Sequence, residues 1–522
     1  MCGLWHHTTA QTTESFMQVI DPNLVNMFQA DKGDNIFNIG KYIYLVNGFV
    51  KNDDGDRKQD IFKIDADTRE IVKRIAMEGP QGDIAIADRG GYWVTSDGFI
   101  LLTGEWRNYS AGRMCTFLAK LNQDLETVWI NYYPDLTTTY LYGEGVAETE
   151  EGYYLLYTGE GLDAFPHAKG EITIIKTDTA GAVLFNKMLT DTFAQTVGYG
   201  DITPTDDGNF LVSSVVRDYY YHPVLGTYTL NAIVHKIDRD AHQIWSKTMG
   251  YAKFPLQESM STALAGGGGA VMWMKDTITT DPAVAWNFPL LYGLDQDGQR
   301  TWTHEWNQWP YSTVYRIKEA SNGDILGVGF YKAGGQSKGK GWLFRLTSTG
   351  EPIWERQYSD SLLRPWSPHL ELLDLCELAD GRIAATGIVF DTTTTNYFNI
   401  NVVLLVVDAN GCLEPGCAEG NQYITSTLEP VYQRPDLPIL RVSPTPATGP
   451  MTVAWPEKLE SGNQAYELRC YDLQGRFVQQ FNWPKGTSVL EIGTDKWKNG
   501  AYRLLLFVQN QPVATGKIVI QN

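Results

Sequence analysis

Apolar and polar positions alternate along most of the chain, and the alternation follows a unit of nearly constant length. The second part of each unit is an apolar strand that ends in Asp, Asn or Thr, followed by a turn and often a Trp. Seven such strand ends lie 57, 56, 60, 57, 52 and 61 residues apart, at Asp65, Asn122, Asp178, Asp238, Asp295, Thr347 and Asp408. A steady period over this many copies predicts a repeat architecture.

The first part of each unit is another alternating strand beside a Gly-rich turn, as in "EEGYYLLYTG", "DDGNFLVSSV" and "SNGDILGVGF". A unit of this length holds about four short strands and their turns. One such sheet cannot bury both of its faces, whereas sheets arranged around an axis can. The predicted fold class is therefore all-β, with a seven-bladed β-propeller over residues 16–420. We expect strands near 36–50 to share a blade with strands near 402–412, because ring closure removes two exposed edges.

The recurring Trp and Asp have structural interpretations. Trp129, Trp245, Trp302 and Trp354 are expected to pack between blades, with stacking on a ligand as the alternative. The Asp at each strand end is expected to form the turn by accepting backbone N–H bonds. The spacing in "DQDGQRTW" does not fit the Asp box of sialidases. The repeats resemble the docking motif of quinoprotein propellers with one residue fewer, which favours a propeller but no quinone cofactor.

Charge and cysteine content narrow the possible partners. A net charge of −19 argues against nucleic acid and anionic membranes as partners. The sequence has no apolar stretch of about 18 residues, so no transmembrane helix is predicted. Six cysteines are too few for a disulfide framework, yet Cys412 and Cys417 flank a Pro-Gly turn. This pair forms a small disulfide loop or remains as two thiols, and the sequence leaves both possibilities open.

Aromatic segments between strands supply the candidate ligand-binding residues. Aromatic side chains on loops at a propeller mouth stack well on sugars and other flat faces, whereas the alternative is a loop packed on its neighbour. The candidates are Arg217, Tyr219, Tyr220, Tyr221, His222, Trp309, Tyr311 and Trp366. We expect "RDYYYHPVLGTY" to be a long insertion between strands.

Catalytic and metal sites have little support in the sequence. Motifs of zinc proteases, nucleophile elbows, P-loops and CxxC sites do not occur, and 61 acidic residues do not nominate a catalytic pair. Asp53, Asp54 and Asp56 cluster in one loop without the spacing of an EF-hand. A calcium site there is the alternative to a solvated acidic turn, and no other metal or cofactor is predicted.

A change of pattern marks a second domain. The seven-fold repeat ends near residue 420, and a Pro-rich linker is predicted over 421–439. Residues 440–522 contain six or seven alternating strands separated by turns such as "LQGR", "PKG" and "KNG". This spacing predicts a small β-sandwich.

The segments "VSPTPATG", "YELRCYDLQGR", "NGAYRLLLF" and "GKIVIQN" follow one another in residues 440–522. Here the chain resembles the type A C-terminal sorting domain of the type IX (Por) secretion system of Bacteroidetes-type bacteria, with Thr445 where the family usually has Asn. The "VVDANGCLEPGC" ending of the repeats also resembles exported proteins that carry this tail. The resemblance assigns the sorting signal to Tyr471, Asp472, Gly475, Arg476, Gly500, Tyr502, Gly516 and Lys517.

The resemblance implies export by the type IX machinery, which would bind this domain and deliver a secreted or cell-surface product. It further implies that the sorting domain is removed after export. It also implies an N-terminal signal peptide, so residues 1–15, which lack a basic n-region, are expected to be an unstructured start or a remnant of one. We expect the propeller to be a non-enzymatic module that binds a polysaccharide or a protein. The alternative is an extracellular glycan-degrading hydrolase or lyase on the same scaffold.

Overall fold

The computed structural model of the 522-residue chain divides into two compact units, Met1–Ser426 (unit 1) and Thr427–Asn522 (unit 2). All helices and strands assigned in the described residues are β-strands, which confirms the all-β fold class. The described residues are 15–19, 35–50, 57–77, 83–87, 91–108, 113–133, 141–160, 172–189, 194–196, 200–222, 227–252, 260–278, 285–306, 312–331, 339–359, 368–391, 399–413, 417, 423–425, 440–456, 466–472, 477–494, 497–508 and 511–521.

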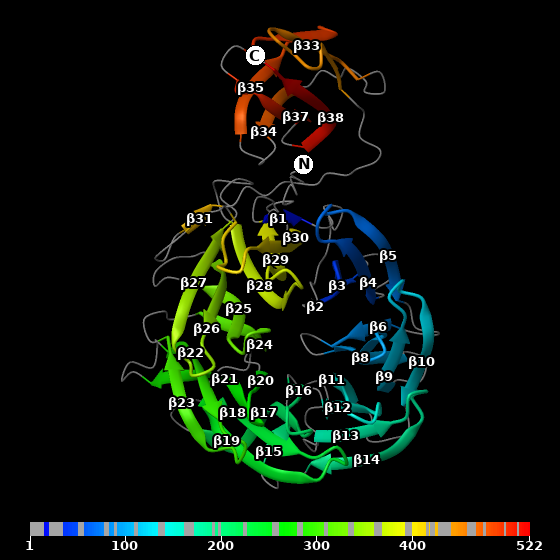
Figure 1. Ribbon diagram of the computed structural model, residues 1–522, viewed down its shortest axis with the longest axis vertical. Coiled ribbons are helices and arrows are strands. Elements are labelled where there is room, and N and C mark those ends of the chain that lie inside the picture. Colours follow the sequence, from blue (N-terminus) through cyan, green and yellow to red (C-terminus); the bar gives the residue numbers. More distant parts are fainter. Residues whose placement is uncertain are drawn as a thin grey trace, which may run out of the picture. The chain divides into compact units, whose positions relative to one another are not determined.

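The described part of unit 1 forms seven sheets that follow one another around a common centre (Figure 1). Sheet 1 is β2 (Asn35–Ile39), β3 (Tyr42–Val50), β4 (Arg57–Asp65) and β5 (Ile71–Met77). Sheet 2 is β6 (Asp83–Ile86), β7 (Tyr92–Val94), β8 (Ile100–Asn108), β9 (Arg113–Leu121) and β10 (Thr127–Tyr133). Sheet 3 is β11 (Leu141–Glu148), β12 (Tyr154–Glu160), β13 (Ile172–Thr177) and β14 (Val183–Leu189).

The next four sheets repeat this order of strands. Sheet 4 is β15 (Ala194–Thr196), β16 (Asp201–Pro204), β17 (Phe210–His222), β18 (Thr227–Ile237) and β19 (Gln243–Ala252). Sheet 5 is β20 (Met260–Leu264), β21 (Gly268–Ile278), β22 (Ala285–Leu294) and β23 (Arg300–Glu305). Sheet 6 is β24 (Thr313–Glu319), β25 (Ile325–Tyr331), β26 (Lys340–Leu346), β27 (Pro352–Ser359) and β31 (Tyr423–Thr425). Sheet 7 is β28 (Pro368–Glu377), β29 (Ile383–Asp391), β30 (Asn399–Val407) and β1 (Phe16–Val19).

The two ends of unit 1 meet in sheet 7, but through a different strand from the one expected. β1 pairs antiparallel with β30, with Phe16 opposite Val406 and Val19 opposite Val403. The expectation that residues 36–50 would lie beside residues 402–412 is wrong, because β2 and β3 pair within sheet 1. A strand before the first recognisable repeat supplies the outer strand that sheet 7 lacks. Sequence periodicity could not find it, since β1 belongs to no copy of the repeat.

The recurring Trp residues pack between neighbouring sheets, which confirms the packing interpretation. Each stands on an outer strand and lies against the Gly of the next sheet's outer turn, in the pairs Trp129–Gly181, Trp245–Gly298, Trp302–Gly350 and Trp354–Gly411. These Gly residues have φ between 72° and 81°, which an L side chain rarely adopts. Between sheets 7 and 1, Phe16 takes the place of Trp, with its ring 4.7 Å from Arg69 Cζ.

Buried cations add a second set of contacts between neighbouring sheets. In sheets 1, 2, 3, 4 and 6 the third strand carries Lys or Arg two residues before the turn-forming residue, and each of these cations bonds the next sheet. The contacts are Lys63–Asp124, Lys120–Tyr154, Lys176–Asp240, Lys236 with Gly267 O and Arg345 with Ala409 O. Arg382 of sheet 7 donates to Asp67 of sheet 1 at 2.9 Å. Because the same position recurs in five sheets, one residue pattern helps to set how these sheets face the next.

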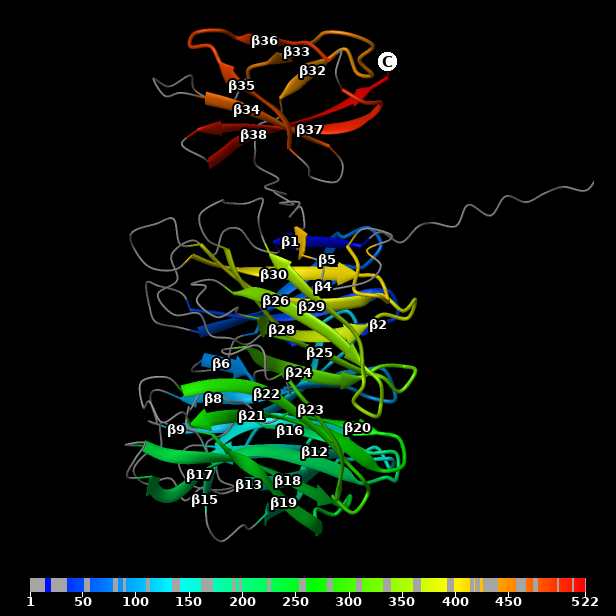
Figure 2. The ribbon, with the colours of Figure 1, turned by 90° about the vertical axis from the view of Figure 1, so that its left-hand side faces the viewer.

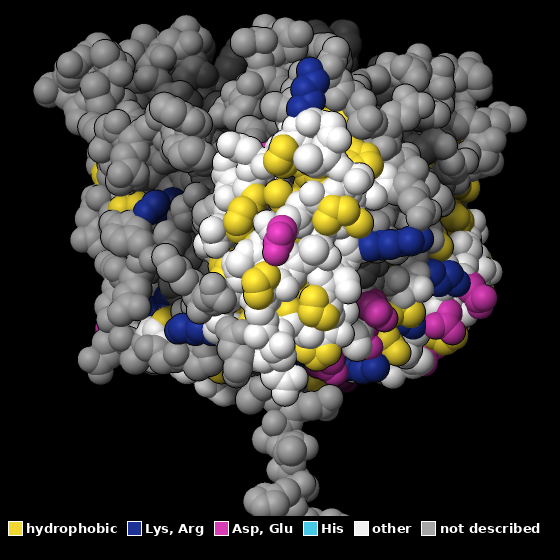
Figure 3. Space-filling view, turned by 90° about the horizontal axis from the view of Figure 1, so that it is seen from above, with side chains coloured by type: hydrophobic (Ala, Val, Ile, Leu, Met, Phe, Trp, Pro, Cys, Tyr) yellow, Lys and Arg dark blue, Asp and Glu magenta, His cyan; other side chains and the backbone are white. Residues whose placement is uncertain are grey.

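Unit 2 is built from two sheets that share one apolar core. One sheet is β32 (Arg441–Ser443), β33 (Met451–Ala454) and β36 (Val489–Ile492). The other has the order β35 (Phe477–Trp483), β34 (Tyr466–Asp472), β37 (Gly500–Val508) and β38 (Gln511–Ile520), and β34, β37 and β38 lie side by side in Figure 2. Met451 and Val453 from the first sheet pack with Leu468, Leu504 and Leu506 from the second. Figure 3 looks onto a face of this unit, where apolar side chains are scattered among polar ones.

The contact between Trp302 and Gly350 can be tested by adding one methyl group. A Cβ on Gly350 would meet Trp302 Cε3 at 2.4 Å, whereas a Cβ on Gly323 would have no atom within 4 Å. The φ values are similar, 81° and 84°, so backbone strain is matched. We expect Gly323→Ala to lower the free energy of unfolding by about 1 kcal/mol and Gly350→Ala by about 1–3 kcal/mol more. Equal losses in urea titrations of the two variants would contradict the packing account.

The ion pair of Asp207 and Lys236 predicts a pH dependence of stability. Burial alone would raise the pKa of Asp207, but hydrogen bonds from Lys236, Thr205 and Asn209 outweigh it and hold the pKa at about 2. The folded pKa lies below the unfolded value of about 3.9, so this stabilisation is present above pH 4 and is lost as the pH falls toward 2. We expect Asp207→Asn to lower the free energy of unfolding by about 1–2 kcal/mol at pH 7. Urea titrations should show this deficit shrinking below pH 4, and a deficit independent of pH would count against the assignment.

Candidate functional site

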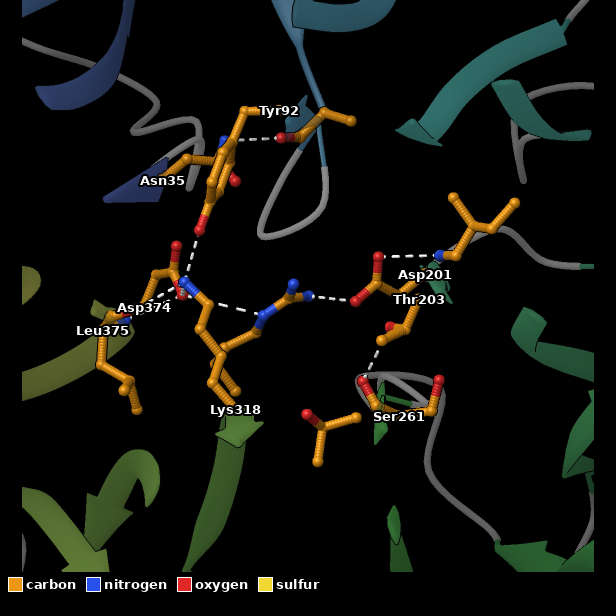
Figure 4. Close-up of polar contacts among 12 residues, drawn as sticks. Asn35, Tyr92, Asp201, Thr203, Ser261, Lys318, Asp374 and Leu375 are labelled. Atoms are coloured by element: carbon orange, nitrogen blue, oxygen red, sulfur yellow. Dashed lines mark hydrogen bonds and ion pairs between the residues drawn. The ribbon is translucent and has the colours of Figure 1, made fainter. Parts of the chain in front are cut away.

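Charged side chains gather at the centre of unit 1, on the inner strands of the sheets. Asp201 on β16, Arg316 on β24 and Asp374 on β28 each lie four residues before the first residue of their tight inner turn. Asn35 on β2 lies four residues before Ile39, after which the turn to β3 begins. The repeat therefore brings one residue per sheet to the same level around the axis, and in these four sheets that residue is polar. We call these residues, together with Lys318 and Tyr92, the axial cluster (Figure 4).

Arg316 lies between the two carboxylates of the axial cluster. Its Nη1 is 2.7 Å from Asp201 Oδ2, and its Nε is 3.7 Å from Asp374 Oδ1. Asp374 is fully buried and accepts N–H bonds from Ile36 at 2.9 Å and Leu375 at 2.8 Å. An unpaired charge at this depth would be strongly unfavourable, so the guanidinium and the backbone donors are what allow the carboxylates to be there.

Lys318 and Tyr92 extend the axial cluster toward sheets 1 and 2. Lys318 lies two residues after Arg316 on β24, and its Nζ is 2.9 Å from Asp374 Oδ1. The same ammonium group donates to Tyr92 Oη and to the carbonyls of Leu375 and Ile36. Tyr92 in turn donates to Ile36 O at 3.0 Å. Hydrogen bonds and ion pairs of the axial cluster thus connect side chains and backbone groups of sheets 1, 2, 4, 6 and 7.

Sheet 5 reaches the same region through neutral hydrogen bonds. Thr203 Oγ1 on β16 donates to Ser261 O on β20 at 3.2 Å. The backbone N–H of Glu319 on β24 donates to Thr262 Oγ1 on β20 at 2.9 Å. These contacts place β20 between the strands that carry Asp201 and Arg316, so the axial cluster is continuous with the packing of the inner strands.

Burial dominates the protonation of the axial cluster. It raises the pKa of Asp201 and lowers the pKa of Lys318, because both lose the solvation of their charged forms. Burial would also lower the pKa of Arg316, but the nearby Asp201 and Asp374 outweigh it and raise that pKa. Burial followed by the charge of Asp374 raises the pKa of Tyr92 well above its usual value, which keeps the phenol neutral. Two carboxylates, one guanidinium and one ammonium make an arrangement that can be neutral overall.

This arrangement limits the chemistry that the axial cluster can perform. Each carboxylate already bonds a cation and backbone N–H groups, so neither is poised as the exposed acid of a glycosidase pair. The pair of Lys318 and Tyr92 has the residue types of a proton relay, since a lysine with a lowered pKa donates to a neutral phenol. Within the described ranges, groups of three or more His, Cys, Asp or Glu that could hold a metal ion are absent.

The expected aromatic ligand site falls mostly on strands or outside the described residues. Arg217, Tyr219, Tyr220, Tyr221 and His222 form the end of β17, where Tyr221 is opposite Tyr228 and His222 is opposite Thr227 of β18. The expectation of a long insertion between strands is therefore wrong for residues 217–222, which extend a hairpin. Because the repeat set the expected strand length, the extra pairs were assigned to a loop. Trp309, Tyr311 and Trp366 lie outside the described residues, and the ligand role of all eight residues stays a prediction.

The residues that the family resemblance assigns to the sorting signal occupy both buried and exposed places in unit 2, and their role in sorting stays a prediction. Tyr502 is buried and donates to Lys498 O at 2.7 Å, and a Cβ on Gly516 would meet Leu440 at 2.9 Å. Lys517 is exposed on β38, directly opposite Arg503 of β37. Tyr471 is half-buried on β34, Asp472 ends that strand and Gly500 begins β37. Gly475 and Arg476 lie outside the described residues. The family's Asn position, here Thr445, accepts the Val519 N–H at 3.4 Å.

The remaining sequence candidates concern the cysteines and the acidic loop. Cys412 and Cys417 are joined by a disulfide, with a Cα–Cα distance of 5.7 Å. The calcium candidates Asp53, Asp54 and Asp56 lie outside the described residues, so that site stays a prediction. In the described part of the chain, helices long and apolar enough to cross a membrane are not found.

Sequence reasoning missed the axial cluster, although a signal for it exists. Charged residues interrupt the apolar first strand of the unit in "GDITP", "YRIKE" and "LLDLCE", at equal distance from the following turn. Alignment of the units on their turns places Asp201, Arg316 and Asp374 at one level of the inner strands. Without this alignment, a single charged residue in a strand indicates a solvent-facing position, because charged side chains are mostly exposed.

Comparison with known proteins gives a family match within unit 2. Residues 441–521 match the family of secretion system C-terminal sorting domains. This match confirms the sorting-domain resemblance of the tail. Among curated protein sequences, none matches the chain.

Solved structures similar to this chain include a β-propeller domain and enzymes of several activities. The β-propeller domain of the Trilobed protease from Pyrococcus furiosus is 11% identical, with 72% of this chain and 94% of that chain covered and a TM-score of 0.37. A polysaccharide lyase, the ulvan lyase of family PL25, is 9% identical over 76% and 96% of the two chains, with a TM-score of 0.47. An α-L-arabinofuranosidase from Fusarium graminearum is 11% identical over 60% and 91%, with a TM-score of 0.37. These similarities transfer no activity to unit 1.

Removal of Arg316 tests whether the axial cluster depends on it. Arg316→Leu leaves Asp201 buried without its cation, so we expect the free energy of unfolding to fall by about 3–5 kcal/mol. Adding Asp201→Asn should recover part of the loss, because the double variant no longer buries that unpaired charge. The control is Arg239→Leu, which removes an exposed ion pair with Glu151 and should cost less than about 1 kcal/mol. Urea titrations in which Arg316→Leu costs no more than the control would contradict this account.

Proposed function

We propose that this protein is exported by the type IX secretion system through unit 2, and that unit 1 works outside the cell or at its surface. The observation that carries the proposal is the match of residues 441–521 to the sorting-domain family. Unit 2 has its own two-sheet core, as a separately recognised signal requires. We propose that its two sheets form a β-sandwich and that the secretion machinery is its partner.

We propose two roles for the sorting residues of unit 2: buried ones maintain the fold of the domain, and exposed ones contact the secretion machinery. Tyr502 and Gly516 are buried in the β37–β38 packing, so we propose that they hold the fold of the signal. Lys517 is exposed and stands opposite Arg503, which places two cations side by side on neighbouring strands. We therefore propose that Lys517 contacts the machinery directly.

We propose that unit 1 is a closed seven-bladed β-propeller. The support is the run of seven sheets, the inner-strand contact between β28 and β2, and the pairing of β1 with β30. Arg382 and Phe16 repeat at the junction of sheets 7 and 1 the cation and aromatic contacts found at other junctions. Closure in this way leaves neither end of the series exposed.

We propose that the propeller is a ligand-binding module, for a polysaccharide or a protein, at the end of the axis where hairpin β17–β18 projects. The support is that both axial carboxylates are paired with cations, Asp201 with Arg316 and Asp374 with Lys318. Paired carboxylates suit a rigid base of a binding site better than a catalytic acid–base pair. The alternative is a glycan-degrading lyase or hydrolase. One observation favours it: Lys318, with a lowered pKa, hydrogen-bonded to neutral Tyr92.

Export can be measured in a bacterium that possesses the type IX system. The full chain, preceded by an inner-membrane signal peptide, should appear in the medium or on the cell surface. Deletion of residues 427–522 should leave it in the periplasm, and Lys517→Glu should reduce export several-fold. The matched control is Lys485→Glu, which changes an exposed lysine in a turn of the same unit. Equal export with and without residues 427–522 would contradict the proposal.

Binding and catalysis can be separated on one panel of bacterial, algal and plant polysaccharides. The binding proposal expects retention of the full chain on at least one polymer without new chain ends. The lyase alternative expects products with an unsaturated end, lost at least a hundredfold in Tyr92→Phe and Lys318→Met. Polymer cleavage that survives both substitutions would exclude the axial pair as the catalyst.

A further inference from the structure

The exit of unit 1 differs from the corresponding place in every other sheet. After the outer turns at Gly181, Gly298 and Gly350, the chain continues directly into the outer strand of the same sheet, as β14, β23 and β27. In sheet 7 that place is already taken by β1 from the other end of unit 1. The chain that leaves Gly411 therefore has no strand position of its own sheet to enter. It carries a disulfide at this point instead.

The last outer turn is fixed firmly before the disulfide begins. Cys412 is buried, its N–H donates to Asp408 Oδ1 at 2.7 Å, and its carbonyl accepts the Asp408 N–H at 3.0 Å. Tyr358 of β27 donates its buried hydroxyl to Gly411 O at 2.7 Å. Cys412 is thus a fixed point on the junction of sheets 6 and 7, and the disulfide ties the departing chain to it.

Beyond Cys417 the chain returns to the same neighbouring strand. β31 pairs in parallel with β27, with Tyr423 opposite Gln357, Ile424 opposite Tyr358 and Thr425 opposite Ser359. A strand of three residues on a parallel edge has little stability by itself. The disulfide shortens the free chain between the fixed turn and β31, because it joins residues 412 and 417 directly. A shorter tether lowers the entropy lost when β31 docks.

We propose that the Cys412–Cys417 disulfide is a redox-dependent clasp that holds β31 on the edge of β27 and so fastens the exit of unit 1 to sheet 6. The bond forms when the two thiols reduce the disulfide of a protein oxidant or of a small molecule. One cysteine thiolate attacks this disulfide, which forms a mixed disulfide and releases the first thiol of the oxidant. The other cysteine then attacks the mixed disulfide at the protein's sulfur, which closes the Cys412–Cys417 bond and releases the second thiol. In a reducing compartment the clasp is open, and in an oxidising one it is closed. The clasp does not depend on the proposed export.

The experiment is hydrogen–deuterium exchange of the full chain with its disulfide intact, reduced by a phosphine, or removed in Cys412→Ser/Cys417→Ser. We expect amides of residues 423–425 to exchange at least tenfold faster in the reduced protein and in the double variant. Amides of β3 and β4 in sheet 1 should keep their rates. The variant Ile424→Pro removes a strand N–H but leaves both cysteines in place. It should accelerate exchange of the remaining amides in 423–425 as much as the loss of the disulfide does, although its disulfide is still closed.

Two results would overturn the clasp. Equal exchange of residues 423–425 in the oxidised protein and the double variant would show that the disulfide does not hold β31. A double variant in which all of unit 1 exchanges faster to the same degree would show a general stabilising cross-link instead. The double variant supplies the test even if the phosphine does not reach the buried Cys412, and mass spectrometry after thiol alkylation reports the redox state in each sample.

Discussion

Arg316 is the residue on which the centre of unit 1 depends. It is buried between Asp201 and Asp374, and a guanidinium at that depth is tolerated only while both carboxylates face it. The three residues come from three different sheets, so their pairing requires those sheets to stand at one height around the axis. A displacement of one sheet along its neighbour would leave a buried charge unpaired. The axial cluster therefore specifies the arrangement of the sheets, whatever it adds to their stability.

Away from the axis, most junctions between sheets contain one or both of two recurring contacts. An aromatic side chain from an outer strand covers the next outer turn, and a buried cation from a third strand bonds a turn or a hydroxyl of the next sheet. Sheet 5 lacks the cation, with Gly293 at that position, and Trp306 donates to Glu355 of sheet 6 at 2.9 Å instead. Burial raises the pKa of that carboxyl, as expected where indoles replace water. At the junction of sheets 5 and 6, a different pair of residues thus supplies the polar contact between neighbouring sheets.

Much of this fold was predictable because a repeat reports each contact several times. The strand period, the Trp packing and the sorting tail follow from patterns that recur or that a family shares. The position of β1 was not predictable in this way, since Phe16–Val19 is a single copy and its partner lies almost four hundred residues away. The extension of β17 through Tyr221 was not predictable for a similar reason, because the lengths of the other hairpins determined the strand length expected here. The axial charges were visible in the sequence but were informative only after the units were aligned on their turns.

The central claim is that unit 2 is an address and that unit 1, ending at the clasped β31, is the working part. The most direct measurement is the intact mass and both terminal sequences of the protein recovered from the medium, surface and cytoplasm of its own host. The account predicts a chain outside the cell that retains residues 16–425 and has lost unit 2. A full-length chain that begins at Met1 and stays in the cytoplasm would contradict it, and unit 2 would then belong to the working protein.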